Sequence, residues 1–139
     1  MMSTTLRNSL LNNWFRGTSY SMPSTYYIGL STTEPLADGT NVYEPSGTSY
    51  KRVAVAANSI NFATASNGKI ANNKVIRFSE ALEVWADSSN PITHYVIYDA
   101  QKGGNLLFFG ALTRSIEVPI SSIVEVPIGG IVTELSNIS

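Results

Sequence analysis

The chain has 139 residues, a formal net charge of −1, one histidine and no cysteine, and this length favours a single domain over residues 1–139. The absence of cysteine excludes a disulfide framework, a thiolate nucleophile and a cysteine-based zinc site, and the balanced charge supplies no basic field for nucleic acid. Only 14% of the residues are charged, against about 25% in a typical globular domain. Ser, Thr and Asn together supply 42 residues, which predicts a neutral, turn-rich surface.

The first segment of the chain has the periodicity of an amphipathic helix over residues 4–16. Its apolar positions repeat as one face of a helix does, and they are Leu6, Leu10, Leu11, Trp14 and Phe15. Ser3, Thr4 or Thr5 is expected to cap the start of the helix, and Gly17 to end it in a left-handed conformation. Because so short a helix is marginal by itself, its apolar stripe must pack on this chain's sheet or on a neighbouring chain.

After Gly17 the pattern changes to short strands separated by turns. Residues 25–31, 50–56, 92–99 and 106–112 are rich in aromatic and β-branched side chains, which favour extended backbone. Asn67-Gly68 is the strongest hairpin signal and is expected to join strands at 60–65 and 70–78. Residues 117–120 and 125–128 repeat Glu-Val-Pro-Ile, and the last strand is expected at 131–135.

These elements predict an all-β fold, an antiparallel β-sandwich or barrel of about seven to nine short strands. We expect a jelly-roll-like arrangement, preceded by the single N-terminal helix. No run approaches the roughly 18 to 20 apolar residues of a membrane span, and no apolar signal segment lies near the start. We therefore expect neither a membrane segment nor a secretory signal.

Residues with catalytic chemistry are few. His94 is the only histidine, and no Gly-x-Ser-x-Gly elbow marks a nucleophile that could use it. Glu80, Glu83 and Asp87 lie close in the sequence and could form a glycosidase-like pair or a cation site, although three acids in a polar connector are more often solvated. Phosphate-binding glycine loops and calcium loops are absent from the sequence. We therefore expect no catalytic residue, metal or cofactor.

Aromatic residues in the predicted loops suggest an alternative function. Tyr20, Tyr43 and Tyr50 lie in or beside loops, where an exposed ring could stack on a sugar. The competing interpretation is that they are ordinary core or rim residues of a β protein. A carbohydrate-binding module for host surface glycans is thus the alternative hypothesis.

Several segments of the sequence, in the same order, resemble a known family. The segments are Phe15–Thr18, Pro23–Pro35, Asp38–Thr40, Glu44–Val53, Ile92–Ala100 and Gly103–Leu112. Together they are similar to small virion structural proteins of tailed bacteriophages, which are usually labelled tail-fibre proteins and sometimes head-decoration or minor structural proteins. The resemblance covers about residues 6–113.

The resemblance implies a non-enzymatic virion component, either a tail-fibre-like subunit or a capsid-decoration subunit. Such a protein assembles in the host cytoplasm and self-associates, with a trimer favoured, and it docks on other virion proteins rather than on nucleic acid or a membrane. The apolar stripe from Leu6 to Phe15 is the candidate assembly interface.

Overall fold

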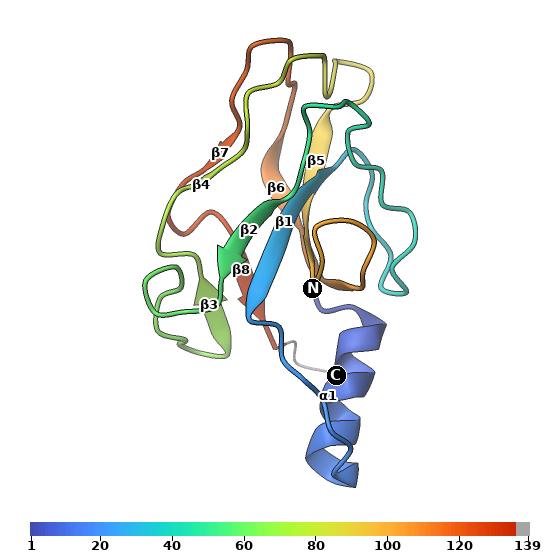
Figure 1. The fold of residues 1–139 in the computed structure, drawn as a ribbon, viewed down its shortest axis with the longest axis vertical. Helices are drawn as coiled ribbons and strands as arrows, with labels where there is room; N and C mark the ends of the chain where they lie inside the picture. The colour runs from blue at the N-terminus through green and yellow to red at the C-terminus, as the bar shows by residue number, and fades with distance from the viewer. Residues whose placement is uncertain (136–139) are drawn as a thin grey trace.

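An open, four-stranded antiparallel sheet forms the centre of the molecule, with the strand order β2-β1-β5-β6 (Figure 1). The computed structural model describes residues 1–135. Its elements are α1 (Thr4–Arg16), β1 (Thr25–Ser31), β2 (Val53–Ala56), β3 (Lys69–Ala71), β4 (Ile76–Arg77), β5 (Ile92–Tyr98), β6 (Leu106–Ile116), β7 (Glu125–Val126) and β8 (Val132–Glu134). The prediction of a mostly antiparallel β fold, preceded in the chain by one N-terminal helix, is confirmed.

The barrel alternative is wrong, and the sandwich forms only roughly. Two small antiparallel sheets, β3-β8 and β4-β7, take the place of the single second sheet that a sandwich would have. They lie to one side of the four-stranded sheet (Figure 1). A jelly roll needs two large sheets, whereas these pairs contain only two or three residues per strand.

The main core lies between the four-stranded sheet and the segments on that side. Ile28 and Leu30 of β1 and Ile97 of β5 contribute the sheet face, and Ile76 of β4 and Val126 of β7 face them in the same buried cluster. Successive side chains of a strand point to opposite faces of a sheet, so the residues between these positions face the other side. The opposite face carries a smaller cluster of Val96, Tyr98, Leu106 and Phe109.

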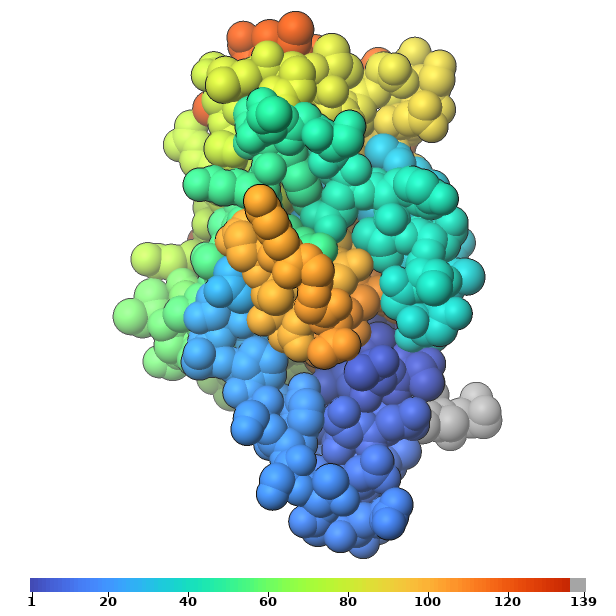
Figure 2. All heavy atoms as spheres, turned by 45° about the vertical axis from the view of Figure 1, so that its right-hand side comes forward, coloured from blue at the N-terminus to red at the C-terminus, as the bar shows by residue number. Residues whose placement is uncertain are grey.

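Two loops cover the opposite face. One is the long connection between β1 and β2, and the other is the connection of residues 99–105 between β5 and β6. In Figure 2 the orange loop of residues 99–105 lies beside the cyan loop that follows β1, above the blue N-terminal helix. This arrangement leaves the sheet covered on both faces.

The N-terminus extends the sheet beyond β6 before the helix begins. Met2 forms an antiparallel bridge with Phe108, and the Ser3 amide donates to the Leu107 carbonyl at 2.8 Å. Both predicted helix caps are present: the Ser3 side chain accepts from the Leu6 amide, and Gly17 has φ 67°. Within residues 1–135 there is no helix with the length and apolar character to cross a membrane.

The Asn67-Gly68 turn forms as predicted, but its strands pair elsewhere. Both residues have positive φ, and Ser66 and Lys69 exchange two backbone hydrogen bonds across the turn. Residues 60–65 form no strand, and the predicted strand 70–78 is divided into β3 and β4. β3 pairs with β8, and β4 pairs with β7, while the predicted local ladder is reduced to isolated bridges of Phe62 with Asn72 and of Ser66 with Lys69.

Candidate functional site

The apolar stripe of α1 divides into a packed half and an exposed half. Leu6 is buried, and Leu10 packs beside it against residues of β6. Leu11, Trp14 and Phe15 are exposed by 45%, 58% and 81%. The stripe therefore packs partly on this chain's sheet, and its other part has no partner within the described residues.

The segment that returns from α1 to β1 adds to the exposed half. Thr18 is held against the helix by two hydrogen bonds, from its amide to the Asn12 carbonyl and from the Asn13 side chain to its carbonyl. Met22 of this segment is exposed by 58%, and it lines with Trp14 a hollow of about 340 Å³. We call Leu11, Trp14, Phe15 and Met22 the helix tip.

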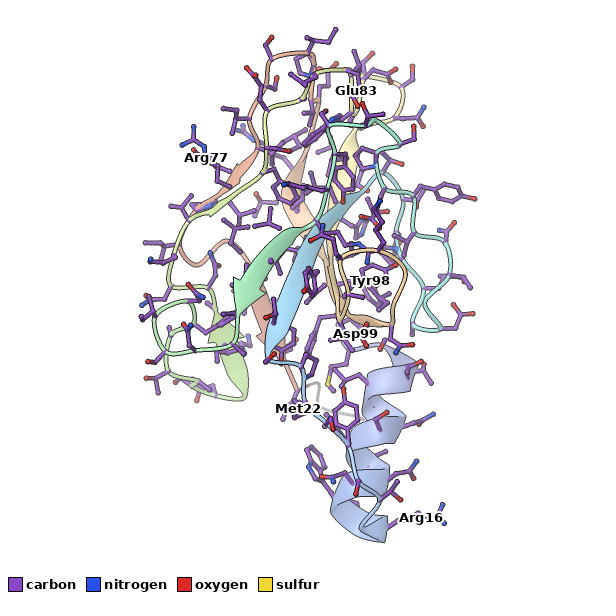
Figure 3. All side chains as sticks on the ribbon, viewed as in Figure 1. Arg16, Met22, Arg77, Glu83, Tyr98 and Asp99 are labelled. Carbon is purple, nitrogen blue, oxygen red and sulfur yellow. The ribbon has the colours of Figure 1, made fainter. Side chains whose placement is uncertain are left out.

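The C-terminal end of α1, which bears Trp14 and Phe15, projects away from the β body and carries the positive charge of Arg16 (Figure 3). In Figure 3, Arg16 lies at the far end of α1 and Met22 lies on the adjoining return segment. The sequence has no acidic residue before Glu34, whereas Arg7 and Arg16 lie on the helix. An apolar surface flanked by arginines, in a segment without acidic residues, is complementary to a partner surface that is apolar and bears carboxylates.

The structure does not bring the three loop tyrosines together. Tyr43 is exposed, and Tyr20 packs against the cluster at the base of α1. Tyr50 packs on the main core, where it stacks on Phe78 at 6.5 Å and meets the Trp85 ring edge-on at 5.2 Å. Tyr50 therefore fits the competing interpretation of an ordinary core residue, because the β1–β2 connection folds back onto the sheet.

A half-buried charged cluster, which we call the arginine clamp, joins the two loops to the sheet. The Arg52 side chain is only 8% exposed, and its Nη2 atom lies 2.7 Å from Oε1 of Glu44. Its Nη1 atom donates to the carbonyls of Ala100 and Gly103, both at 2.8 Å. The guanidinium also lies 3.6 Å from the centre of the Tyr98 ring, a cation–π geometry.

Tyr50 and Gly29 complete the arginine clamp. The Tyr50 hydroxyl donates to Glu44 and accepts from the Leu30 amide, and burial, together with the negative charge of Glu44, raises the pKa of Tyr50. A Cβ atom at Gly29 would lie 2.8 Å from the Tyr50 hydroxyl and 2.9 Å from Glu44 Oε2, so a glycine allows this close approach.

Sequence reasoning missed the clamp as a unit. Glu44, Tyr50, Arg52 and Tyr98 all belong to the segments that carry the family resemblance, but nothing in the sequence shows that Arg52, just before β2, meets Glu44 and Tyr98. Because Arg52 joins Glu44 to the carbonyls of Ala100 and Gly103, the clamp ties the two covering loops to each other.

The three candidate carboxylates do not converge on a site. Glu83 accepts hydrogen bonds from the amide and hydroxyl of Ser49, and these bonds lower the pKa of Glu83. Asp87 accepts from the amides of Ser89 and Asn90 and thereby closes a turn. Glu83 and Asp87 thus have local structural roles, and Glu80 is exposed.

His94 lies in β5, opposite Ser31 of β1 and Ala111 of β6. Its Nδ1 atom is 2.8 Å from the Thr93 hydroxyl. Burial lowers the pKa of His94, and the charge of Glu34 partly opposes this effect. Among residues 1–135, no group of three His, Asp or Glu side chains is placed to hold a metal ion.

A second hollow lies on the side of the sheet that bears the small sheets. It has a volume of about 640 Å³, and its lining includes the rings of Tyr26, Phe62 and Phe108. Sequence reasoning did not single out these rings, because they belong to segments read as strands.

Comparisons with known proteins agree with the sequence resemblance. A family model described as "Podophage GP4 fiber I protein gp80" matches residues 1–134, which is almost the whole chain and includes the C-terminal strands. A search of curated proteins gives no match. The resemblance to phage virion proteins of the tail-fibre type is confirmed, and the chain belongs to the family of the podophage GP4 fibre I protein gp80.

Proposed function

We propose that this protein is a non-enzymatic structural subunit of a phage fibre and that it docks on another virion protein through the helix tip. The observation that carries the proposal is the exposure of Trp14 and Phe15, by 58% and 81%, on a helix whose Leu6 and Leu10 pack against the sheet. Apolar side chains gathered at one projecting end are typical of an interaction site. Burial in a partner would remove them from water, and large aromatic residues contribute most to such contacts.

The non-enzymatic part of the proposal is supported by the family and by the local roles of the candidate acids. Glu83 is engaged by Ser49, and Asp87 closes a turn. A paired general acid and base would instead need two carboxyl groups facing a common space.

The proposal includes self-association as a homo-oligomer, with a trimer favoured, in the virion after assembly in the host cytoplasm. The scarcity of charge supports this part, because subunit contacts built from neutral polar and apolar groups bury few ions, and desolvating ions is costly. The fibre description of the family favours a fibre subunit over capsid decoration. Counting copies per particle by quantitative mass spectrometry distinguishes them, since decoration requires far more copies.

The docking proposal is tested with phage that carry Trp14→Ser together with Phe15→Ser. The matched control is Leu82→Ser, which removes a side chain exposed by 68% outside the helix tip. We expect the double variant to keep the circular dichroism spectrum of the purified wild-type protein but to be lost from purified particles, while the control is incorporated normally. Incorporation of the double variant at the wild-type level would contradict the proposal.

Self-association is tested separately by sedimentation of the purified protein. We expect a species heavier than the 15.0 kDa chain, and a monomer at all concentrations would contradict this part alone. If the double variant still self-associates but is lost from particles, the helix tip binds a different virion protein rather than a second copy.

A further inference from the structure

We propose that the hollow lined by Tyr26 and Phe62 is a binding site for a neutral saccharide. Its volume of about 640 Å³ falls within the range of roughly 300–1,000 Å³ found for small-molecule sites. No residue of the helix tip and none of the three loop tyrosines lines it, although Tyr26 and Phe108 also line the hollow beside Trp14. The site adds a binding activity to the structural function proposed above.

The floor and one wall of the hollow are aromatic and apolar. Tyr26 of β1, Ile97 of β5 and Phe108 of β6 come from the four-stranded sheet, while Phe62 comes from the connection between β2 and β3. The Tyr26 and Phe62 rings are nearly perpendicular, with centres 6.1 Å apart. A pyranose ring has an apolar face of C–H groups that packs on such aromatic surfaces.

The rim of the hollow carries neutral hydrogen-bonding groups. Ser59, Thr64, Asn73 and Thr133 line it with hydroxyl and amide groups, and their side chains have no hydrogen-bond partner among the described residues. Sugar hydroxyls both donate and accept, so they match groups of this kind. A wholly apolar ligand would leave the same groups without partners, which is costly once water is removed.

None of the lining residues carries a charge at neutral pH. Burial raises the pKa of the Tyr26 phenol, so this group also stays neutral. An anionic or cationic ligand would lose water without gaining a counter-charge. The absence of charge in the lining therefore favours a neutral sugar over an acidic one.

The wall of the hollow is held in place without a ligand. The Oδ1 atom of Asn58 accepts from the amides of Ile60 and Asn61 at 3.1 and 3.0 Å, and the Asn61 side chain donates to the Ala56 carbonyl. The Ala63 amide donates to the Ala71 carbonyl at 3.0 Å. A preformed wall reduces the ordering cost of binding.

The test uses the purified full chain in two assays. In the first, binding of maltose, cellobiose, lactose and N,N′-diacetylchitobiose at millimolar concentration is measured by saturation-transfer NMR. In the second, the chain is applied to an array of neutral and acidic bacterial glycans. We expect binding of at least one neutral sugar, with transfer to its ring C–H protons. Phe62→Ala should weaken this binding about tenfold, the loss expected when an aromatic contact and its buried area are removed.

Two further variants keep the test decisive if Phe62→Ala unfolds. Thr64→Trp places a large ring at an exposed rim position and should block the hollow, whereas Tyr43→Ala removes an exposed ring elsewhere and should leave binding unchanged. The proposal is overturned by silence of every probe, by binding of acidic sugars only, or by equal binding of Thr64→Trp and wild type. The helix-tip double variant should bind sugar normally, so failure here and failure of the docking proposal are distinguishable.

Discussion

Replacing Arg52 with alanine is expected to destabilise the fold more than any exposed charge substitution in the chain. The change removes the partner of Glu44, the donor to two loop carbonyls and the cation above the Tyr98 ring. Among the described residues, Glu44 would then have only the Tyr50 hydroxyl as donor in a half-buried site. The two covering loops would lose their shared anchor on the sheet.

The magnitude follows from the burial of the pair. Breaking a buried ion pair by removing one partner costs about 3–5 kcal/mol. The Glu44 side chain is 19% exposed, so water compensates part of its lost interaction and the lower part of this range applies. We therefore expect a loss of about 3 kcal/mol in the free energy of unfolding.

Urea denaturation provides the assay, because urea, unlike guanidinium, leaves ion pairs unscreened. Unfolding is followed by tryptophan fluorescence, since Trp85 is buried in the native core. The matched control is Arg77→Ala, which removes an exposed pair with Glu125 at 3.4 Å and should cost at most about 1 kcal/mol. A loss below about 1 kcal/mol for Arg52→Ala, or equal losses for both variants, would refute the reasoning.

Three further predictions concern the core, the only histidine and the helix. Ser49→Ala removes the acceptor of the Trp85 indole N–H and should cost about 1–3 kcal/mol, with an altered near-ultraviolet circular dichroism signal; an unchanged stability would contradict this role. Because burial lowers the pKa of folded His94, the unfolded chain binds a proton more readily near its ordinary pKa of 6.5, and stability should fall as the pH is lowered from about 7 to about 5.5. His94→Gln should flatten that slope in urea titrations at the two pH values, and an identical slope would exclude the histidine as its source. Leu6→Ala should cost about 2–5 kcal/mol through a cavity under α1, whereas Leu11→Ala should lie within about 0.5 kcal/mol of wild type; thermal melts that rank them in the reverse order would show that the helix docks through another face.

Elements with strong local signals could be predicted from the sequence. The helix begins after Ser3 and ends before Gly17 because the cap groups and the left-handed residue act within one turn. β1 and β5 were recognisable from dense aromatic and β-branched residues, which favour extended backbone wherever they are placed. The Asn67-Gly68 turn formed because both residues tolerate positive φ.

Strand pairing and sheet closure were not predictable in the same way. β3 and β4 lie on the C-terminal side of a correctly predicted turn, yet they pair with β8 and β7 near the end of the chain. These strand pairs are stabilised by side chains that meet across the core. The apolar periodicity of one segment indicates a strand or a helix, but it does not indicate which distant strand will pair with it. The choice of an open sheet over a barrel depended on the same long-range contacts.

The candidate sites show the same division. The sequence alone placed an apolar stripe on α1, but only the tertiary structure divided it into buried Leu6 and exposed Phe15, because burial depends on which helix residues reach Leu107 and Phe108 at the start of β6. Tyr50 was expected beside a loop, at the start of the predicted strand 50–56, and it packs on the core because the β1–β2 connection folds over the sheet. The sequence by itself determined the helix, the central strands and the family. The tertiary structure decided which side chains face water. It also decided which distant groups come into contact, such as Arg52 and the carbonyl of Gly103.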